Sequence, residues 1–442
     1  MSTDGQPPLV VEMHRTLPAT GAERKRPQPK PNFLLNGCWM LIAGLISAHP
    51  LCAAASKEIT PPLSAERTLQ ISAEMDRLSK GIIATGYVPG LAWAMVSNGE
   101  VVAAQGYGVG DVRTRSKVSD ETVFRLASLS KGFASALSGK LVENGVLEWS
   151  DRVQDMVPAF LLKDQEGAGR LRIDELLSHR VGLPYNTYDR QLESEEPYPM
   201  LVEKLGDINP TCSVGVCYAY QNVAFSLIGD VVFAATGDFF THQVEKQLFH
   251  PLGMTTATYG SYALMHSPSF ALPHVGTRGT LRSVTPKETY YRVPPAAGVN
   301  ASARDLAQWM LAQLGHRPEV LSPELIILLH TALVATPDQL RSSPWRRERL
   351  RTAAYALGWR VYDYAGHDLV FHAGAVQGYR AVLGLLPEQD FGIAIVWNGE
   401  APVPGGLFPT IIDMRLNLPE HDWLQLARYK PKISTKKKPR AK

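Results

Sequence analysis

Three short motifs follow one another along the chain, and together they supply the parts of a serine acyl-transfer site. They are Ser128-Leu129-Ser130-Lys131, Tyr220-Gln221-Asn222 and His372-Ala373-Gly374. Each is weak alone, because an S-x-x-K pattern arises about once or twice by chance in a chain of ordinary composition. The basic tail holds such a second match, Ser434-Thr435-Lys436-Lys437. The ordered set is more specific, since each motif provides a group that the others lack.

A serine hydroxyl needs a neighbouring base before it attacks a carbonyl at neutral pH. On a helix, Ser128 and Lys131 lie on one face, and burial would lower the pKa of Lys131 so that its amine accepts the proton. Tyr220 is a partner base if the charge of the lysine favours its phenolate, or the acid that protonates the leaving group. Asn222 offers an amide to hold Lys131 and bind a substrate carbonyl. Gly374 lies on a strand-like run, where a glycine lets substrate backbone approach closely.

The motifs and the phrases around them resemble the serine β-lactamase and penicillin-binding superfamily, specifically its class C β-lactamase and D-Ala-D-Ala carboxypeptidase branch with related serine esterases. The resemblance runs from about residue 65 to about residue 418. The supporting phrases occur in the family's order: Phe124-Arg125-Leu126-Ala127, Leu176-Leu177-Ser178-His179, Gly182-Leu183-Pro184, Pro251-Leu252-Gly253-Met254, Ala297-Gly298-Val299 before Ser302, Asp305-Leu306 and Leu357-Gly358-Trp359.

The resemblance implies that Ser128 is the acylated nucleophile, Lys131 its proton partner and Tyr220 the general base and acid. It also implies that Asn222 positions the substrate, and that the backbone N–H groups of Ser128 and Ala375 form the oxyanion hole. Two such donors stabilise a developing oxyanion strongly in a dry cleft. No cofactor or metal ion is expected, because the histidines form no H-x-x-x-H or H-x-H cluster.

The third motif departs from the family's usual Lys-Thr-Gly, whose lysine and hydroxyl hold the substrate carboxylate. His372 replaces the lysine and Ala373 replaces the hydroxyl residue. The lost hydroxyl removes a hydrogen bond of about 1.5–3 kcal/mol to a charged acceptor. Arg380, on the same predicted strand region, is the candidate replacement, and His372 is expected to lie in the cleft in a binding or electrostatic role. The change argues against an efficient β-lactamase without excluding one.

The elements that must position these residues predict a mixed α/β (α+β) fold. Strands at both ends of the chain and a helical middle predict an antiparallel sheet formed by both termini and flanked by helices, with a mostly helical insert at about 150–290. A charge-dense stretch, Arg341 to Arg351, is interpreted as a solvated surface loop, and His179 as a structural residue. The predicted helices are 63–83, 128–144 and 408–417, and the predicted strands 91–97, 101–106, 357–364, 369–372, 379–386 and 391–397.

The first 55 residues predict a signal peptide, followed by a hydrolase domain at 56–428. Basic residues from Arg24 to Lys30 precede an apolar stretch from Phe33 to about Ala48, and Cys52-Ala53-Ala54-Ala55 provides a small-residue cleavage site. A retained signal anchor is the alternative, although the stretch is short and interrupted for a membrane span. We therefore expect export, to the periplasm or the medium.

Cysteine content agrees with export, because only Cys212 and Cys217 remain once that segment is removed. In an oxidising compartment a disulfide is expected between them; the alternative is two buried thiols.

The tail at 429–442 is basic and has no acidic residue. We expect it to be disordered and solvated, with contact to an anionic envelope surface as the alternative. Nucleic-acid binding is not expected, since no aromatic residues are interleaved among these charges.

The sequence thus predicts an exported serine hydrolase that works through an acyl-serine intermediate. The expected substrate is a small molecule or a peptidoglycan-derived peptide, with a β-lactam or D-alanyl-type amide bond as the target. Two alternatives stay open: a serine esterase of the same fold, and a penicillin-recognising sensor that is acylated without turnover.

Overall fold

The computed structural model describes residues 64–429 of the chain. The predicted signal segment with Cys38 and Cys52, the linker to residue 63 and the basic tail from residue 430 lie outside the described residues.

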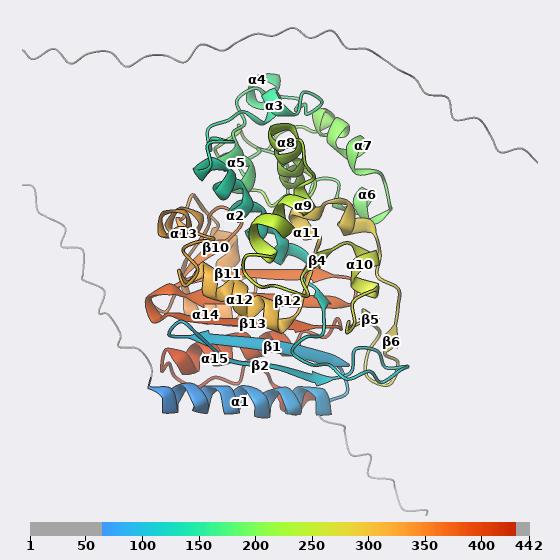
Figure 1. The fold of residues 1–442 in the computed structure, drawn as a ribbon, viewed down its shortest axis with the longest axis vertical. Helices are drawn as coiled ribbons and strands as arrows, with labels where there is room; N and C mark the ends of the chain where they lie inside the picture. Colours follow the sequence, from blue (N-terminus) through green and yellow to red (C-terminus); the bar gives the residue numbers. More distant parts are fainter. Residues whose placement is uncertain (1–63, 430–442) are drawn as a thin grey trace, which may run out of the picture. The chain divides into compact units, whose positions relative to one another are not determined.

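An eight-stranded antiparallel sheet is the largest element, in the order β2-β1-β13-β12-β11-β10-β9-β8. The N-terminal hairpin of β1 and β2 lies against C-terminal β13, with Ala92 of β1 opposite Val396 of β13 (Figure 1). One sheet is therefore built from both ends of the chain, and the predicted fold class is confirmed. The strands are β1 (Gly90–Ser97), β2 (Glu100–Gly108), β8 (Val334–Ala335), β9 (Leu350–Tyr355), β10 (Arg360–Tyr364), β11 (His367–Val376), β12 (Tyr379–Leu386) and β13 (Phe391–Trp397).

Helices cover both faces of this sheet, so its central strands are apolar on both sides. Successive side chains of β1 alternate between two buried clusters: Trp93 packs towards α1 (Ala65–Ala84) and α15 (Leu407–Arg415), whereas Ala94 packs towards α12 (Ala303–Gln313). In α1 the buried positions Ile71, Met75, Leu78 and Ile82 repeat at helical spacing. Each large side chain buried in this way stabilises the fold by about 1.5–3 kcal/mol.

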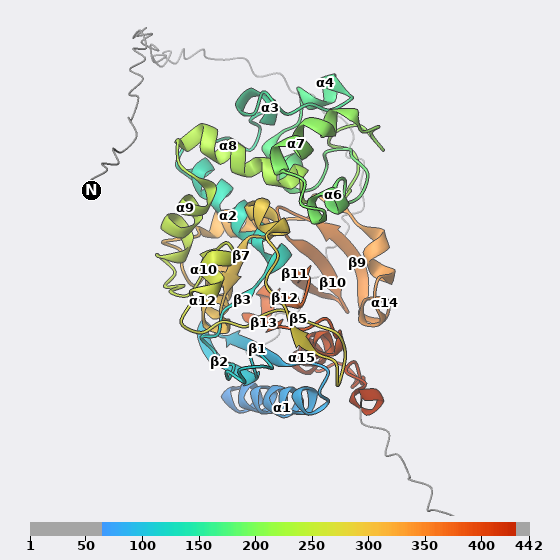
Figure 2. The ribbon, with the colours of Figure 1, turned by 90° about the vertical axis from the view of Figure 1, so that its right-hand side faces the viewer.

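A mostly helical region lies on the opposite side of the sheet from α1 (Figure 2). It contains two small sheets, in the orders β3-β7-β4 and β5-β6. Its helices are α2 (Ser130–Glu143), α3 (Val153–Met156), α4 (Gln165–Ala168), α5 (Ile173–Leu177), α6 (Asp189–Glu193), α7 (Tyr198–Glu203), α8 (Leu227–Thr236), α9 (Phe240–Val244), α10 (Ser261–Met265), α11 (Pro294–Ala297) and α13 (Pro323–His330). Its strands are β3 (Phe124–Arg125), β4 (Thr258–Tyr259), β5 (His274–Val275), β6 (Arg282–Ser283) and β7 (Val299–Ala301).

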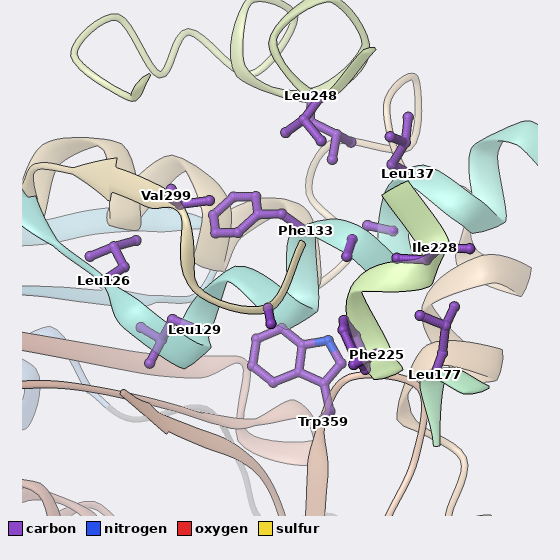
Figure 3. Packing of buried hydrophobic residues seen from close by; sticks show 14 of the residues in the cluster. Leu126, Leu129, Phe133, Leu137, Leu177, Phe225, Ile228, Leu248, Val299 and Trp359 are labelled. Carbon is purple, nitrogen blue, oxygen red and sulfur yellow. The ribbon is translucent and has the colours of Figure 1, made fainter. Parts of the chain in front are cut away.

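Helix α2 is buried almost all round, which fixes the position of any group that it carries. Phe133 stacks on Trp309 with 4.0 Å between ring centroids. A Cβ atom at Gly132 would stand 2.8 Å from the indole of Trp359, so this helix lies directly on that ring. Figure 3 shows Phe133 and Trp359 with their apolar neighbours around the helix.

Two local predictions are wrong. The helix expected to start at Ser128 starts at Ser130, and Ser128 instead lies in a preceding 3₁₀ turn, Ala127–Leu129. The stretch Arg341 to Arg351, interpreted as a surface loop, contains the short helix α14 (Pro344–Arg349) and leads into β9. Two of its arginines are turned inward: Arg346 lines a cavity, and Arg349 pairs with the buried Asp413. Within residues 64–429 no single helix is long and apolar enough to cross a membrane, although Ala224–Thr236 and Phe240–Phe249 would qualify as a pair bent by 83°.

Candidate active site

Ser128 lies on the wall of a cavity of about 590 Å³ between the helical region and the sheet. The backbone enters its turn through Ala127, which has a φ of 50°. A left-handed conformation at a residue with a Cβ costs about 1–3 kcal/mol and persists only where its surroundings enforce it. Here the Leu126 N–H donates to the Val299 carbonyl at 2.9 Å, which anchors the turn to β7.

Lys131 is fully buried in α2, and its Nζ donates to Asn222 Oδ1 at 2.7 Å and to the Ala296 carbonyl at 3.1 Å. Burial lowers the pKa of Lys131 well below its usual 10.5, although the nearby Asp189 carboxylate opposes the change. A neutral amine has two N–H groups and one lone pair. The two bonds use both N–H groups, so the lone pair of the neutral form is free to accept a proton.

Tyr220 is buried and lines the same cavity as Ser128. Lys131 Nζ lies 4.5 Å from the centroid of the Tyr220 ring. Burial raises the pKa of Tyr220 above 10; the Ser128 hydroxyl and the charge of Arg360 only partly oppose this. Burial thus disfavours charge on both groups, which favours the phenol form of Tyr220 and the second predicted role, protonation of the leaving group.

The segment that carries Tyr220 is held by the Leu176–Pro184 phrases. His179 Nδ1 accepts the Gln221 N–H at 3.2 Å, and its ring centroid lies 4.4 Å from that of Tyr220. Burial lowers the pKa of His179 well below 6.5, so the ring is neutral and Nδ1 is free to accept. His179 thus has a positioning role in this structure, as its structural interpretation predicts.

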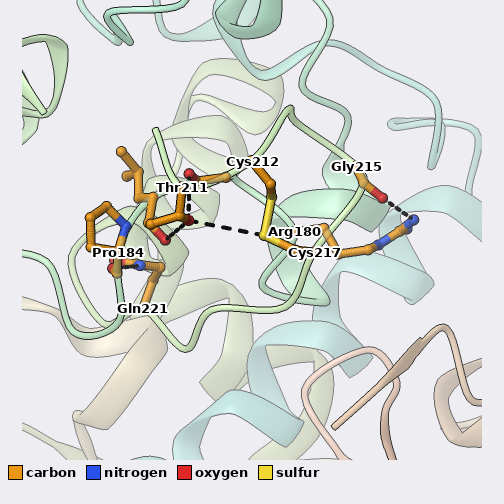
Figure 4. Close-up of a disulfide and its surroundings, with 9 residues drawn as sticks. Arg180, Pro184, Thr211, Cys212, Gly215, Cys217 and Gln221 are labelled. Carbon is orange, nitrogen blue, oxygen red and sulfur yellow. Dashed lines mark hydrogen bonds between the residues drawn. A yellow bond between two sulfur atoms is a disulfide. The ribbon is translucent and has the colours of Figure 1, made fainter. Parts of the chain in front are cut away.

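Cys212 and Cys217 form the expected disulfide, and the alternative of two free thiols is excluded. The loop that they close is tied back to the Gly182-Leu183-Pro184 turn, since the Thr211 N–H donates to the Gly182 carbonyl at 2.8 Å (Figure 4). The Gly215 N–H likewise donates to the Arg180 carbonyl at 2.8 Å. These bonds restrain the chain just before Tyr220.

Gly374 brings the third motif against the serine turn. A Cβ atom at this position would stand 2.1 Å from the Leu126 carbonyl oxygen and 3.1 Å from the Ser128 nitrogen. The chain's own backbone therefore requires the glycine, and its place in the cavity wall leaves the predicted approach of substrate backbone as a prediction. Ala373 and Ala375, on either side, are exposed and line the cavity.

One edge of β11 is open beside Ser128. Its pairing with β10 ends at Phe371, opposite Arg360, whereas its pairing with β12 continues to Val376. Each of these hairpins has a two-residue loop, so the residue pair next to the loop exchanges backbone hydrogen bonds. Hydrogen-bonded and non-hydrogen-bonded residue pairs then alternate along the strands. This alternation turns the backbone groups of Ala373 and Ala375 towards the open edge. The Ala373 carbonyl is bound there by His372 Nδ1 at 2.9 Å, so a strand-like ligand would pair first with the backbone groups of Ala375.

His372 and Arg380 do not lie where the motif suggests. His372 is only 1% exposed, does not line the cavity, and pairs through Nε2 with the Tyr355 hydroxyl at 3.1 Å. The expected direct contact with substrate is therefore corrected to a place behind the cavity wall. Arg380 lines the cavity on β12, but its Nη1 donates to the carbonyls of Val376 and Tyr379, both at 2.7 Å. It is thus at the Val376 end of the open edge, away from Ala373.

Three charged residues of the cavity were missed by the sequence reasoning: Asp189, Arg346 and Arg360. Asp189 Oδ2 accepts the Asn222 Nδ2–H at 2.8 Å, which turns Asn222 Oδ1 towards Lys131. Burial raises the pKa of Asp189 to about 6. Arg360 follows the Leu357-Gly358-Trp359 phrase directly, which was the only signal available for it. Among the described residues no group of three or more metal-ligating side chains occurs.

The family model described as Beta-lactamase matches residues 75–410, a span that includes all three motifs and the open edge of β11. The chain belongs to the beta-lactamase family. It has the beta-lactamase fold, and the predicted superfamily is confirmed.

The relatives of this beta-lactamase family member share low sequence identity with it. It is 25% identical over 335 residues to Protein flp of Staphylococcus aureus (strain MW2), which covers 74% of this chain and 62% of that protein. It is 24% identical to Unguisins hydrolase ungD of Aspergillus violaceofuscus, covering 76% of this chain and 64% of that protein. The chain thus spans less than two thirds of the length of these relatives.

Solved structures share the fold. A penicillin-binding protein homologue from Pyrococcus abyssi, described as octameric, aligns with a TM-score of 0.67 at 22% identity, over 80% of this chain and 78% of that one. EstCE1, described as a hydrolase with promiscuous acyltransferase activity, aligns with a TM-score of 0.65 at 18% identity, over 79% of this chain and 100% of that one.

Proposed function

We propose that the chain is an exported, class C-like serine hydrolase that cleaves a D-alanyl-type or β-lactam amide bond through an acyl-Ser128 intermediate. One observation carries this proposal: Ser128 and Tyr220 line the same cavity, and the buried amine of Lys131 lies 4.5 Å from the centroid of the Tyr220 ring.

In acylation, Ser128 Oγ attacks the substrate carbonyl and its proton passes through the Tyr220 hydroxyl to the lone pair of Lys131. The C–N bond then breaks, and the same proton returns through Tyr220 to the leaving nitrogen. Because Tyr220 is a phenol at rest, it gives up one proton as it gains another and never has to hold a stable negative charge. Water repeats the path to release the acyl group.

The open edge of β11 supplies the electrostatic part of the mechanism. The Ala375 N–H faces this edge, and together with the Ser128 N–H it would hold the developing oxyanion. Removing one such donor costs a factor of about 10²–10³ in rate in other enzymes. Asn222 is already bound by Lys131 and Asp189, which leaves one amide N–H for a substrate carbonyl.

The serine esterase is the second candidate, and the fold shared with EstCE1 favours it. The penicillin-recognising sensor differs from both hydrolases in turnover, since a sensor stays acylated.

The experiment is intact mass spectrometry over time, after mixing the mature protein with a penicillin, an N-acyl-D-alanyl-D-alanine peptide or a neutral activated ester. We expect a +acyl adduct or product formation with at least one amide probe, and neither with Ser128→Ala. A lasting penicillin adduct without product identifies a sensor. Turnover of the ester alone identifies an esterase, and undiminished activity in Ser128→Ala would overturn the proposal.

Export is supported by the disulfide Cys212–Cys217 and by the basic and apolar N-terminal segment. Expression of the full chain in a bacterial host tests it. The mature protein should be found outside the cytoplasm with an N-terminus near residue 56. Full-length protein retained in the cytoplasm would contradict export.

A further inference from the structure

The cavity beside Ser128 holds two guanidinium groups that the mechanism above does not use. Arg360 begins β10, and Arg346 lies on α14; both line the cavity. The two arginines come from segments on either side of β9, so the fold brings them together from different elements.

Arg360 is placed next to the leaving-group side of the reaction. Its guanidinium carbon lies 5.5 Å from the ring centroid of Tyr220 and 5.5 Å from that of Tyr355. Its Nη1 is buried and has no hydrogen-bond partner among residues 64–429. A buried donor without a partner destabilises the folded protein, and does so more strongly when it is charged. Since Tyr220 protonates the leaving nitrogen in the proposed mechanism, Arg360 lies beside the leaving group.

Arg346 is held by neutral partners. Its Nη1 donates to Gln339 Oε1 at 2.6 Å and to Ser342 Oγ at 2.7 Å. Its guanidinium carbon lies 5.3 Å from the ring centroid of Phe371, the residue paired with Arg360 across the sheet. Its Nε is buried and has no partner within residues 64–429.

Neither guanidinium is balanced by a carboxylate of the described chain, because no ion pair joins Arg346 or Arg360 to one. The carboxylates near the site interact electrostatically with other cations: Asp189 interacts with Lys131, and Glu400 interacts with Arg380. The leaving-group side of the cavity therefore has two excess positive charges in a partly desolvated place. Such charges are stable when a ligand supplies their counter-ions.

We propose that Arg360 and Arg346 form an anion site for a leaving group with two negative charges, namely an amino acid with an acidic side chain. Arg360 binds the α-carboxylate next to the scissile bond, and Arg346 binds the side-chain carboxylate. This inference rests on the proposed function and names its substrate class. In the reaction the acyl carbon–nitrogen bond breaks, Ser128 Oγ takes the acyl group, and the amino-acid nitrogen leaves with the proton that Tyr220 returns.

The experiment compares three peptides of the series N-acyl-D-alanyl-X, in which X is D-glutamate, D-alanine or D-alaninamide. These leaving groups carry two, one and no negative charges. We expect kcat/KM to fall by about 10- to 100-fold at each step, as a charge-assisted hydrogen bond of about 1.5–3 kcal/mol predicts. Arg346→Gln should remove the difference between D-glutamate and D-alanine, and Arg360→Gln the difference between D-alanine and D-alaninamide. Arg347→Gln, at an exposed position of the same helix α14, should keep both differences.

The wild-type ranking is informative even if a variant fails to fold. Equal kcat/KM for all three peptides, or a preference that survives in folded Arg346→Gln and Arg360→Gln, would overturn the anion site. A neutral fluorophosphonate that labels Ser128 reports on the serine site separately. Labelling with no charge preference rejects the anion site alone, whereas absence of labelling and of all turnover rejects the proposed function.

Discussion

At the scale of single residues, the site depends on what burial does to charge. Lys131 is surrounded by protein, with two acceptors placed for two N–H groups, and its neutral form is the one that the surroundings favour. Tyr220 is kept as a phenol by the same desolvation. In the proposed mechanism the base is therefore the lone pair of the Lys131 amine, and the Tyr220 hydroxyl passes protons to and from it.

Replacement of this base tests its role. Lys131→Arg introduces a guanidinium that stays charged, so the rate of Ser128 acylation should fall by about 10²–10⁴. In the wild type the rate should fall as the pH drops through the lowered pKa of Lys131, because protonation consumes the lone pair. Stopped-flow acylation against pH measures both. Lys140→Arg in the same helix is the control, and near-normal acylation by Lys131→Arg would contradict the assignment.

Asp189 gives a second prediction, concerning stability. Its folded-state pKa of about 6 lies above its usual 3.8, so folding favours the protonated form. Stability is therefore lost as the pH rises from about 4 to above 6, by up to roughly 3 kcal/mol. Asp189→Asn has no carboxyl group to titrate at this position. The free energy of unfolding of the variant should therefore rise relative to that of the wild type as the pH increases across this interval.

Urea unfolding at pH 4 and pH 7.5 measures this change. Asp155→Asn, at an exposed position, is the control and should show no such gain. A difference between Asp189→Asn and wild type that stays constant across the interval would contradict the prediction.

At the scale of elements, the contact between β11 and the serine turn has no spare room. Gly374→Ala would press its methyl group against the Leu126 carbonyl. We expect a loss of about 1–3 kcal/mol from overpacking, and roughly 100-fold slower acylation if the turn moves by 1 Å. Gly405→Ala is a matched control in the same cavity, since its nearest neighbour would be Trp397 at an ordinary 3.8 Å. Thermal melts and acylation rates that are unchanged in Gly374→Ala would contradict this account.

The secondary-structure elements differ in how well the sequence predicted them. Alternating and helical apolar patterns predicted the N-terminal hairpin, the C-terminal strands and α1 closely, because burial on a sheet or helix leaves a periodic trace. The prediction for the charge-dense stretch at Arg346 was wrong, because an arginine can pack its methylene groups and guanidinium against aromatic rings. Such packing leaves no periodic hydrophobic pattern in the sequence. Motif order located Ser128, Lys131 and Tyr220, whereas Asp189 and Arg360 are brought to them only by the three-dimensional fold.

At the scale of the whole molecule, the sheet makes the two ends of the domain interdependent. Strand β1 contacts β2 and C-terminal β13, and its apolar side chains enter the buried clusters on both faces. A fragment starting at residue 110 lacks β1, β2 and α1, and should neither unfold cooperatively nor acylate Ser128. Adding residues 64–109 as a separate peptide should restore acylation at least partly. Circular dichroism melts and labelling measure this, and an active, cooperatively folded fragment would contradict it.

The position of β1 beside β13 also sets a time order during synthesis. A ribosome completes the residues of β1 early, yet their neighbour, β13, emerges only when almost the entire domain has been translated. The central sheet thus has no way to close co-translationally, and a contact of such high sequence separation makes folding slow. This delay fits the proposed export, because it keeps the nascent chain unfolded, and so able to pass a translocation channel, until its last strand is available.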